Sequence, residues 1–592
     1  MGTNEKFRKI SITFYIVLAV FLLLVIRLWQ LQILQGNEYR KLSESNRLKI
    51  ISIPAPRGII FDRNGIPLVK NSPYYCASLI PDQFDKSKAN LLSQILNIPA
   101  DEILEKLGKN NLKPFELIRL KEGLSFKDVV YVESRRSDIP GLVIDVEVSR
   151  EYIYGEVGSH IIGYLGKLTP SQSKEPAFKD VPRDVFIGQW GVEKLFDYSL
   201  RGIHGKRIIE VDALGREIRL LQEKPAIKGK DITLSIDINL QQKAENALGK
   251  KAGAIIALNP ETGEILSMVS KPSFDPNLFT RGINYDEWIS LTQDKRKPIL
   301  NRALQGLYPP GSIFKIVTAV AGLEEGVITR ETRINCKGGI IYGGRYFGCW
   351  RRDGHGIISL HRAMVESCDA YFYEIGKRLG IDKIYDYAIS LGLGKETGVE
   401  FPDEQKGFIP NTKWKVENKK VPWFIGETFH AAIGQGYILV TPVQIAVMTG
   451  AIANGGILYK PTLVKDTQPT IIGKPDIKIE TLETIKKALY GVVNDSKGTG
   501  LAAKSNLINI AGKTGTAQVV ELKKDTGNLP ERFRDHAWFA AFAPVEKPEI
   551  SLAVLVEHGG KGGGVAAPIA KEIIEAYLSP KNKEEKFLSK NN

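Results

Sequence analysis

The chemistry of this chain centres on Ser312 and Lys315, which follow the helix-breaking run Pro309-Pro310-Gly311. A helical pattern of apolar residues starts at Ser312, so we expect a helix whose first backbone N–H groups are unpaired and favour developing negative charge. Lys315 lies three residues on, on the same helical face and within reach of the serine hydroxyl. A serine becomes a good nucleophile when a neighbouring amine can take its proton. The pair therefore predicts Ser312 as a nucleophile with Lys315 as its base.

The S-x-x-K spacing is weak evidence by itself, because Ser171 and Lys174 match it in a polar loop. Two later motifs distinguish the first match from the second. Ser367-Cys368-Asp369 and Lys513-Thr514-Gly515-Thr516 follow Ser312 in order on one domain-sized segment. Together the three motifs resemble those of the active sites of penicillin-binding proteins and serine β-lactamases.

This resemblance implies a role for each residue of the second motif. Ser367 would relay a proton between Lys315 and the leaving amine. For Lys315 to act as a base its pKa must be lowered, and we expect burial and the cation Lys513 to lower it. Asp369 stands where Asn is commoner in the family. Elongation-type members often carry Asp there, so this residue indicates that branch.

The third motif is expected to form the strand edge on which substrate lies. The resemblance implies that the Thr514 and Thr516 hydroxyls hold the terminal carboxylate of a D-Ala-D-Ala peptide, while Lys513 supplies positive potential. Gly515 allows a peptide carbonyl to approach the backbone closely. The backbone N–H groups of Thr516 and Ser312 would form the oxyanion hole.

Three of the four cysteines share one window with a histidine: Cys336, Cys349, His355 and Cys368. Three thiolates and an imidazole make a closed tetrahedral zinc set. Because neighbours in an extended turn point to opposite sides, Cys368 would face away from the cleft and tie the Ser367 turn to this loop. Two alternatives to structural zinc stay open: a Cys336–Cys349 disulfide, natural in an oxidising extracytoplasmic compartment, and three free buried thiols. We expect no cofactor for catalysis.

The chain begins with the features of a membrane anchor. Residues 1–9 predict a basic cytoplasmic tail, and the stretch from Ile10 to Ile26 carries no charge. With the apolar residues up to Leu34, it is long enough for a bilayer, which needs roughly 17–25 residues. No small-x-small cleavage site follows, as a cleaved signal peptide would require. Residues 10–34 therefore predict a single-pass anchor in the inner (cytoplasmic) membrane, with all later residues on the periplasmic side.

Residues 35–230 resemble the non-catalytic pedestal, or dimerisation-type domain, of class B penicillin-binding proteins. Residues 57–65 match the R-G-x-I-x-D-R-N-G signature near the anchor of that class. Taken alone, this stretch predicts a β-hairpin with an Asn-Gly turn. Strand-like and helical patterns alternate between about residues 70 and 145, which predicts a small α+β head lobe.

Residues 231–580 are expected to form an α+β transpeptidase domain. Residues 254–258 and 264–268 predict a hairpin, and residues 509–519, 536–543 and 550–556 predict three later strands. We expect an antiparallel sheet of about five strands, flanked by helices that come largely from residues 311–455. The resemblance implies the penicillin-binding/β-lactamase-like fold, whereas the pattern alone gives α+β. Residues 581–592 predict a charged tail.

The resemblance implies a class B penicillin-binding protein of the elongation type, a serine-type D,D-transpeptidase that cross-links peptidoglycan. Ser312 would attack D-Ala-D-Ala, release D-Ala, and pass the acyl group to an amine of a neighbouring stem peptide; β-lactams would acylate the same serine. The alternatives are a division-type transpeptidase, a D,D-carboxypeptidase, a β-lactam sensor and an inactive scaffold. A sensor normally has several membrane spans, and a scaffold would be expected to lack Ser312 or Lys315.

The family also implies partners. Because no glycosyltransferase domain precedes the pedestal, we expect a separate SEDS glycosyltransferase (RodA), together with MreC and the lipid-linked precursor. The net charge of +14 is not gathered into a basic run, and no nucleic-acid motif is present, so we expect no nucleic acid. With 43% hydrophobic and 25% charged residues the chain is globular, and four cysteines exclude a disulfide scaffold.

Overall fold

The computed structural model divides the chain into two compact units. The smaller unit comprises Met1–Arg57, Asn71–Ser149 and Arg201–Gly229, and the larger unit comprises Gly58–Lys70, Arg150–Leu200 and Lys230–Asn592. The residues described are 2–37, 39, 47–108, 117–178, 181, 185–212, 217–280, 282–519 and 530–588.

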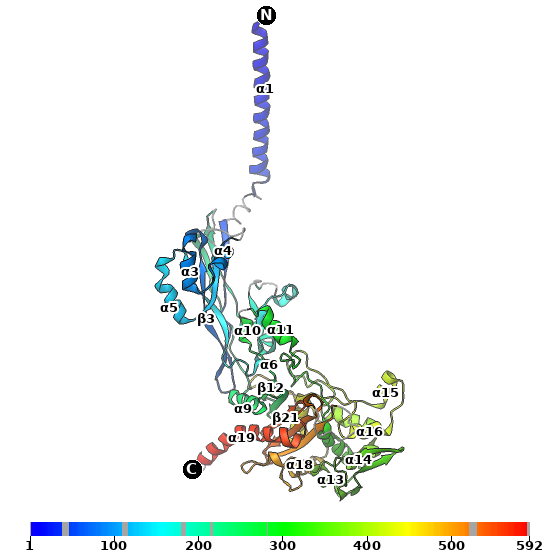
Figure 1. The fold of residues 1–592 in the computed structure, drawn as a ribbon. Helices are drawn as coiled ribbons and strands as arrows, with labels where there is room; N and C mark the ends of the chain where they lie inside the picture. Colours follow the sequence, from blue (N-terminus) through cyan, green and yellow to red (C-terminus); the bar gives the residue numbers. More distant parts are fainter. Residues whose placement is uncertain are drawn as a thin grey trace. The chain divides into compact units, whose positions relative to one another are not determined.

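The smaller unit begins with a long apolar helix, α1 (Gly2–Trp29), which continues in a π-helical turn, η1 (Gln30–Leu34). The window Ile12–Leu34 has a mean hydropathy of 2.5, and none of it is buried against protein. An apolar helix with no protein around it needs another apolar environment. The helix, blue in Figure 1, is long and apolar enough to cross a membrane, as predicted for residues 10–34.

The α+β head lobe predicted between residues 70 and 145 is present in the smaller unit. Strand β3 (Pro67–Leu79) pairs with β4 (Ile118–Leu124). Helices α3 (Ala89–Leu96), α4 (Ala100–Leu107) and α5 (Phe126–Ser134) each contribute at least one buried apolar side chain to a core shared with these strands. A second sheet in this unit has the antiparallel order β1 (Leu48–Ile53), β8 (Gly205–Val211) and β9 (Glu217–Lys224).

Two stretches of the predicted pedestal, residues 58–70 and 150–200, belong to the larger unit. Long-range pairing explains the difference: β2 (Ile60–Phe61) runs parallel to β10 (Ile232–Thr233). The turn after β2 is the predicted Asn-Gly hairpin, in which the Asp62 carboxylate accepts hydrogen bonds from the backbone N–H groups of residues 64 and 66, both at 2.8 Å. In addition, Arg150 and Glu193 form a fully buried ion pair at 2.7 Å.

The centre of the larger unit is a five-stranded antiparallel sheet in the order β12-β11-β21-β20-β19, with β19 at one edge. This confirms the predicted sheet. The strands are β11 (Gly253–Leu258), β12 (Ile265–Lys271), β19 (Ala511–Ala517), β20 (His536–Ala543) and β21 (Ile550–Val556).

Both faces of this sheet are buried. In β11, Ala254 and Ile256 belong to one hydrophobic core, whereas Ile255 and Ala257 belong to another. Because its side chains are apolar on both faces, β11 is a continuous apolar run, whereas the edge strand β19 carries the polar residues of the third motif. One core is shared with α9 (Ile238–Leu248) and α19 (Gly562–Leu588), and the other with α12 (Lys315–Glu324), α14 (Asp369–Ser390) and α17 (Pro442–Ala453).

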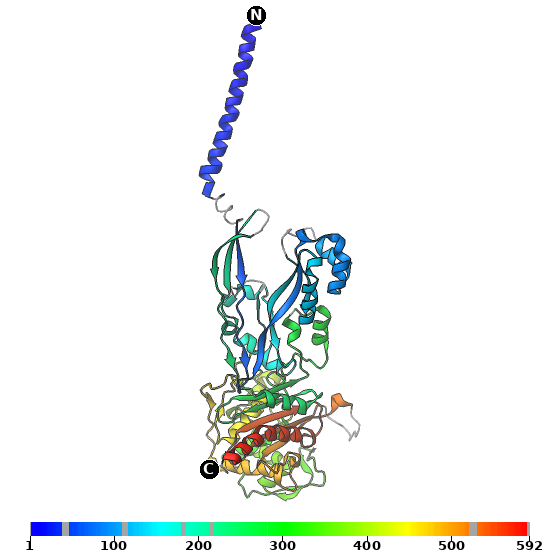
Figure 2. The ribbon, with the colours of Figure 1, turned by 90° about the vertical axis from the view of Figure 1, so that its left-hand side faces the viewer.

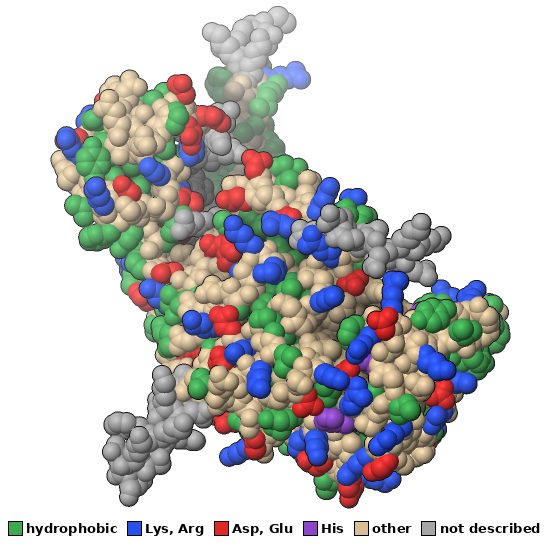
Figure 3. Space-filling view, turned by 60° about the horizontal axis from the view of Figure 1, so that its bottom comes forward, with side chains coloured by type: hydrophobic (Ala, Val, Ile, Leu, Met, Phe, Trp, Pro, Cys, Tyr) green, Lys and Arg blue, Asp and Glu red, His purple; other side chains and the backbone are tan. Residues whose placement is uncertain are grey.

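Figure 2 shows α19 in red alongside the orange and red strands of the sheet. The helix continues through Leu588, so the first part of the predicted charged tail is helical, while residues 589–592 lie outside the described residues. The other helices of eight or more residues described in this unit are α11 (Tyr285–Gln293), α15 (Thr412–Lys419), α16 (Ile425–Ala432) and α18 (Ile479–Asn494), and the shorter α13 spans Leu360–Val365. On the face shown in Figure 3, basic side chains are interspersed with acidic ones, as the sequence predicted for a dispersed net charge.

Candidate active site

Ser312 lies in a tight turn rather than in the first turn of an α-helix. The 3-10 turn η7 spans Gly311–Phe314 and α12 begins only at Lys315, so the predicted helix start was three residues too early. Gly311 has φ +53°, a left-handed conformation that favours glycine, and its N–H donates to the Gly434 carbonyl at 3.0 Å. A Cβ on Gly311 would lie 2.6 Å from the Thr516 carbonyl oxygen. Glycine therefore lets the Ser312 turn pack directly against β19.

The Lys315 amine is completely buried and contacts the second motif. Its Nζ lies 2.8 Å from the Ser367 carbonyl oxygen, 3.2 Å from Ser367 Oγ and 2.7 Å from Asp369 Oδ1. An ammonium group has three N–H donors, and these acceptors use all of them. The S-x-x-K spacing predicts the Ser312 hydroxyl beside the Lys315 amine. Among the described residues, the three hydrogen bonds of that amine go to the Ser367–Asp369 turn.

The Lys513 amine, also fully buried, approaches the same serine from the third motif. Its Nζ donates to Ser367 Oγ at 3.0 Å and to the Thr514 carbonyl at 3.2 Å. Burial holds the pKa of Lys513 well below its usual value, and the Lys315 cation lowers this pKa further, against an opposing effect of Asp369. The Ser367 hydroxyl thus lies between two buried amines.

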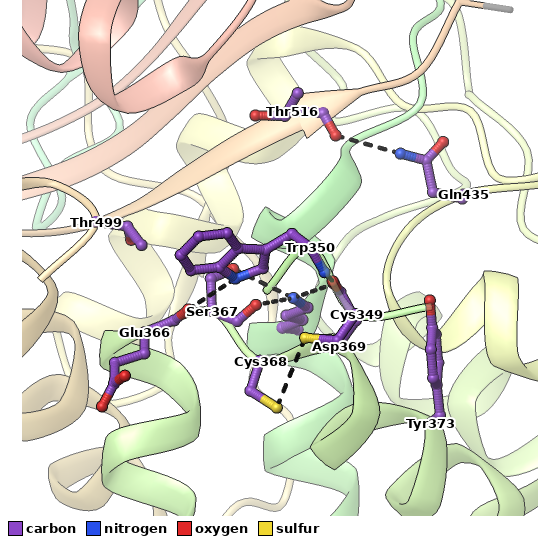
Figure 4. A network of polar contacts seen from close by, with 12 residues as sticks. Cys349, Trp350, Glu366, Ser367, Cys368, Asp369, Tyr373, Gln435, Thr499 and Thr516 are labelled. Carbon is purple, nitrogen blue, oxygen red and sulfur yellow. Dashed lines mark hydrogen bonds and ion pairs between the residues drawn. The ribbon is translucent and has the colours of Figure 1, made fainter. Parts of the chain in front are cut away.

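Trp350, which no motif singled out, contacts both ends of the Ser367 turn (Figure 4). Its backbone N–H donates to Asp369 Oδ2 at 2.9 Å, and its indole Nε1 donates to the Glu366 carbonyl at 3.0 Å. Asp369 therefore accepts from Lys315 with one carboxylate oxygen and from Trp350 with the other. The sequence signal that could have marked Trp350 is its position directly after Cys349.

The third motif lies on β19, the edge strand of the sheet, as its expected role requires. A Cβ on Gly515 would lie 2.8 Å from the Trp538 Cβ and 2.9 Å from the Pro310 carbonyl oxygen, so glycine is needed there for close packing. Two residues that sequence reasoning missed contact this strand. Thr514 Oγ1 donates to Thr499 Oγ1 at 2.9 Å, and Gln435 Nε2 donates to the Thr516 carbonyl at 3.2 Å. Neither belongs to a recognisable motif.

The four residues Cys336, Cys349, His355 and Cys368 form one buried cluster whose ligand atoms all lie within 4.8 Å of one another. His355 Nδ1 is 3.5 Å from Cys336 Sγ and 3.6 Å from Cys349 Sγ, and the Cys349 and Cys368 sulfurs are 4.0 Å apart. Zinc with Zn–S of about 2.3 Å and Zn–N of about 2.0 Å gives tetrahedral edges of about 3.5 Å (N–S) and about 3.8 Å (S–S). The donor set and its spacing therefore fit zinc.

Within the cluster, the hydrogen bond between the Cys349 and Cys368 sulfurs lowers the pKa of Cys349 and raises that of Cys368. All four cysteines of the chain are free, so the structure contains no Cys336–Cys349 disulfide. Figure 4 shows that the Cys368 side chain points toward Cys349 and away from the Ser367 hydroxyl, as expected for a clamp behind the catalytic turn.

The second S-x-x-K match has none of these contacts. Ser171 is exposed, beside the short 3-10 turn Gln172–Lys174, and its hydroxyl lies 3.0 Å from Thr169 Oγ1. The three motifs that do converge bring two lysines, a carboxylate and a serine hydroxyl behind the turn that carries Ser312. Such an arrangement can move a proton to and from a serine nucleophile.

Comparisons with known proteins identify the family of this chain. The family model described as the penicillin-binding protein transpeptidase domain matches residues 253–575, and the one described as the penicillin-binding protein dimerisation domain matches residues 52–234. The peptidoglycan D,D-transpeptidase MrdA of Acinetobacter baumannii is 35% identical over 592 residues, covering 96% of this chain and 87% of the relative.

Two solved structures have the same architecture. The penicillin-binding protein PBP2 of Helicobacter pylori, solved in complex with MreC, has a TM-score of 0.79 at 30% identity, covering 90% of this chain and 99% of that chain. A chain from a structure on polymerization and crosslinking by a peptidoglycan synthase complex has a TM-score of 0.73 at 32% identity, covering 97% of this chain and 98% of that chain.

Proposed function

Since the chain belongs to the penicillin-binding proteins, and among them to the elongation-type peptidoglycan D,D-transpeptidases, we propose that it cross-links stem peptides through an acyl-enzyme on Ser312. The position of the Ser367 hydroxyl supports the residue assignment. Its Oγ lies 3.2 Å from Lys315 Nζ and 3.0 Å from Lys513 Nζ. This hydroxyl connects two amines that can exchange a proton.

The charges of the site indicate how Lys315 becomes a base. Lys315 is paired with Asp369 at 2.7 Å, and the lowered pKa of Lys513 favours a neutral amine there. When Lys315 passes its proton to Ser367 Oγ, the serine's own proton moves to Lys513. Lys315 is then neutral and takes the proton of Ser312 as that hydroxyl attacks the substrate carbonyl.

The second half of the reaction reverses these transfers. The C–N bond to the terminal D-Ala breaks, and the leaving amine takes a proton returned through Lys513 and Ser367. An amine of a second stem peptide then attacks the Ser312 ester, gives its proton to the same relay, and frees the serine. Backbone N–H groups of Ser312 and Thr516 would bind the oxyanion, while the hydroxyls of Thr514 and Thr516 would bind the donor's terminal carboxylate.

Product analysis of the full-length chain in detergent tests this function, with lipid-linked precursor polymerised by a SEDS glycosyltransferase. We expect cross-linked dimers together with free D-Ala, both lost in Ser312→Ala. Release of D-Ala without dimers would instead establish a D,D-carboxypeptidase. Retention of dimers in Ser312→Ala would contradict the assignment of the nucleophile.

For the buried cluster we propose structural zinc held by Cys336, Cys349, His355 and Cys368. When bound, the ion would supply a rigid tetrahedral anchor and no catalytic chemistry, because four protein ligands leave no open position. Cys368 lies between Ser367 and Asp369 in the chain, so fixing its sulfur restrains both neighbours. The support is the donor set together with the 3.5–4.0 Å separations of its ligand atoms.

Metal analysis of protein purified without chelator tests the zinc site. We expect one zinc per chain, lost in Cys336→Ser and retained in Cys76→Ser, a control that changes a buried cysteine in the head lobe. A metal-free wild type with four titratable thiols would favour free thiols. A metal-free wild type with two titratable thiols would favour the disulfide.

We also propose partners and a location for this chain. The H. pylori relative is in complex with MreC, and a second relative belongs to a peptidoglycan synthase complex. By this similarity, the anchor and the smaller unit would bind MreC and a SEDS glycosyltransferase of the RodA type, with the larger unit on the periplasmic side of the inner membrane. Co-purification with each partner, before and after exchange of α1 for an unrelated apolar helix, tests which contacts the anchor provides.

A further inference from the structure

The loop of Cys349, Trp350 and Arg351 contacts the Ser367 turn through three consecutive residues. Cys349 Sγ lies 4.0 Å from Cys368 Sγ, and Arg351 Nη1 lies 3.5 Å from Glu366 Oε2. Between them, Trp350 donates its backbone N–H to Asp369 and its indole N–H to the Glu366 carbonyl. The loop therefore holds the turn from Glu366 to Asp369 at both ends.

This turn needs an external restraint, because Ser367 has φ +52°. The left-handed region costs a residue with a Cβ about 1–2 kcal/mol relative to the right-handed one. Relaxation of φ to a negative value would rotate the side chain and carry Oγ away from its position between Lys315 and Lys513. The left-handed φ of Ser367 is therefore required for its hydroxyl to lie between the two amines.

Trp350 is well placed to supply the restraint. Its side chain is 60% exposed, so burial alone does not fix it. The indole is instead oriented by the hydrogen bond to the Glu366 carbonyl at 3.0 Å and by an edge contact with the His355 ring, with centroids 5.4 Å apart. The carbonyl that it binds belongs to the peptide unit leading directly into Ser367, so the hydrogen bond opposes rotation of that peptide.

We propose that Trp350 is a positioning residue for acylation. Its indole Nε1–H holds the Glu366–Ser367 peptide so that the Ser367 hydroxyl stays between the two lysine amines. This inference rests on the proposed function of Ser312. It states that Trp350 acts through Ser367 on the rate of bond formation, not on the affinity for the peptide or β-lactam.

The test replaces Trp350 in the full-length chain by benzothienylalanine, which has the shape of tryptophan but a sulfur in place of the N–H group. Trp350→Phe is the genetically encoded counterpart. The matched control is Ile341→Ala. Ile341 is an apolar residue, 77% exposed, in the hairpin formed by β14 (Gly339–Tyr342) and β15 (Arg345–Gly348). Stopped-flow acylation by a fluorescent penicillin separates the dissociation constant of the first complex from the acylation rate constant.

We expect both Trp350 variants to acylate about two- to tenfold more slowly, the effect of one lost neutral hydrogen bond, with an unchanged dissociation constant. Ile341→Ala should match the wild type. A benzothienylalanine variant that acylates at the wild-type rate overturns the inference. A larger dissociation constant for the first complex with an unchanged acylation rate constant also overturns the inference, since the indole would then contact the ligand directly. A wild type that is not acylated at Ser312 overturns the proposed function, and the inference falls with it.

Discussion

Removal of the Ser367 hydroxyl tests the proton relay at its centre. Ser367→Ala deletes Oγ, which contacts both Lys315 Nζ and Lys513 Nζ. A glycine variant, Ser367→Gly, deletes the same hydroxyl but also relieves the strain of φ +52°. The pair of variants therefore separates the chemistry of the hydroxyl from the conformation of the turn.

The expected magnitudes follow from these contacts. A positioned proton-transfer group contributes about 10²–10⁴ in rate, so both variants should acylate slower by about that factor. Each also leaves two buried amines with one acceptor fewer, which should lower the free energy of unfolding by about 1–3 kcal/mol. Glycine recovers about 1–2 kcal/mol of the left-handed strain but loses about 0.5–1 kcal/mol through chain entropy, so its stability should equal or slightly exceed that of alanine.

Stopped-flow acylation by a fluorescent penicillin, with thermal unfolding in the same detergent, gives both quantities. Equal, large losses of acylation rate in the two variants would support the relay. Recovery of the acylation rate in Ser367→Gly would show that the Ser367 hydroxyl acts only by holding the left-handed backbone conformation, not by transferring protons. An acylation rate of Ser367→Ala within about threefold of the wild type would rule out the relay, because a loss that small lies far below the range for proton-transfer groups.

Three further predictions use other parts of the larger unit. The acylation rate should fall at pH values below the lowered pKa of Lys513, because the neutral Lys513 amine accepts the relayed proton. Lys513→Arg should be inactive at every pH tested, since the guanidinium group stays charged. Burial lowers the pKa of His160 to about 4, so His160 takes up a proton below about pH 6.5 in the unfolded chain but not in the folded chain. Its contribution to the free energy of unfolding should drop by up to about 3 kcal/mol as pH falls from 6.5 to 4. His160→Gln should remove this contribution and leave that of His536, whose pKa burial also lowers to about 4. Gly311→Ala should reduce acylation about hundredfold, because its Cβ would lie 2.6 Å from the Thr516 carbonyl oxygen and displace the nucleophile's turn; Gly326→Ala, at φ +66° with nothing within 4 Å, is the control for backbone strain without a clash.

The sheet and the convergence of the three motifs could be predicted because their signals are local. Residues 536–543 and 550–556 are continuous apolar runs, and they form β20 and β21 with the same bounds. The motif order likewise placed Ser367 and Lys513 beside Lys315. The start of the Ser312 helix was less accurate, because the sequence pattern does not distinguish a 3-10 turn from the first turn of an α-helix.

Features that depend on long-range packing could not be predicted. Strand β2 pairs with β10, far along the chain, and this pairing moves residues 58–70 into the larger unit. Thr499 and Gln435 reach β19 from loops without a motif. Trp350 gains its position only because the Cys349 loop folds over the Glu366–Asp369 turn, a contact that the cysteine spacing hinted at but did not specify.

Peptide mapping by mass spectrometry after reaction with benzylpenicillin shows directly whether Ser312 is the acylated residue. We expect one penicilloyl adduct, on the peptide that contains Ser312. The adduct should be present in the wild type and in Ser171→Ala, and absent in Ser312→Ala. An adduct on any other residue, or labelling that survives Ser312→Ala, would contradict the account.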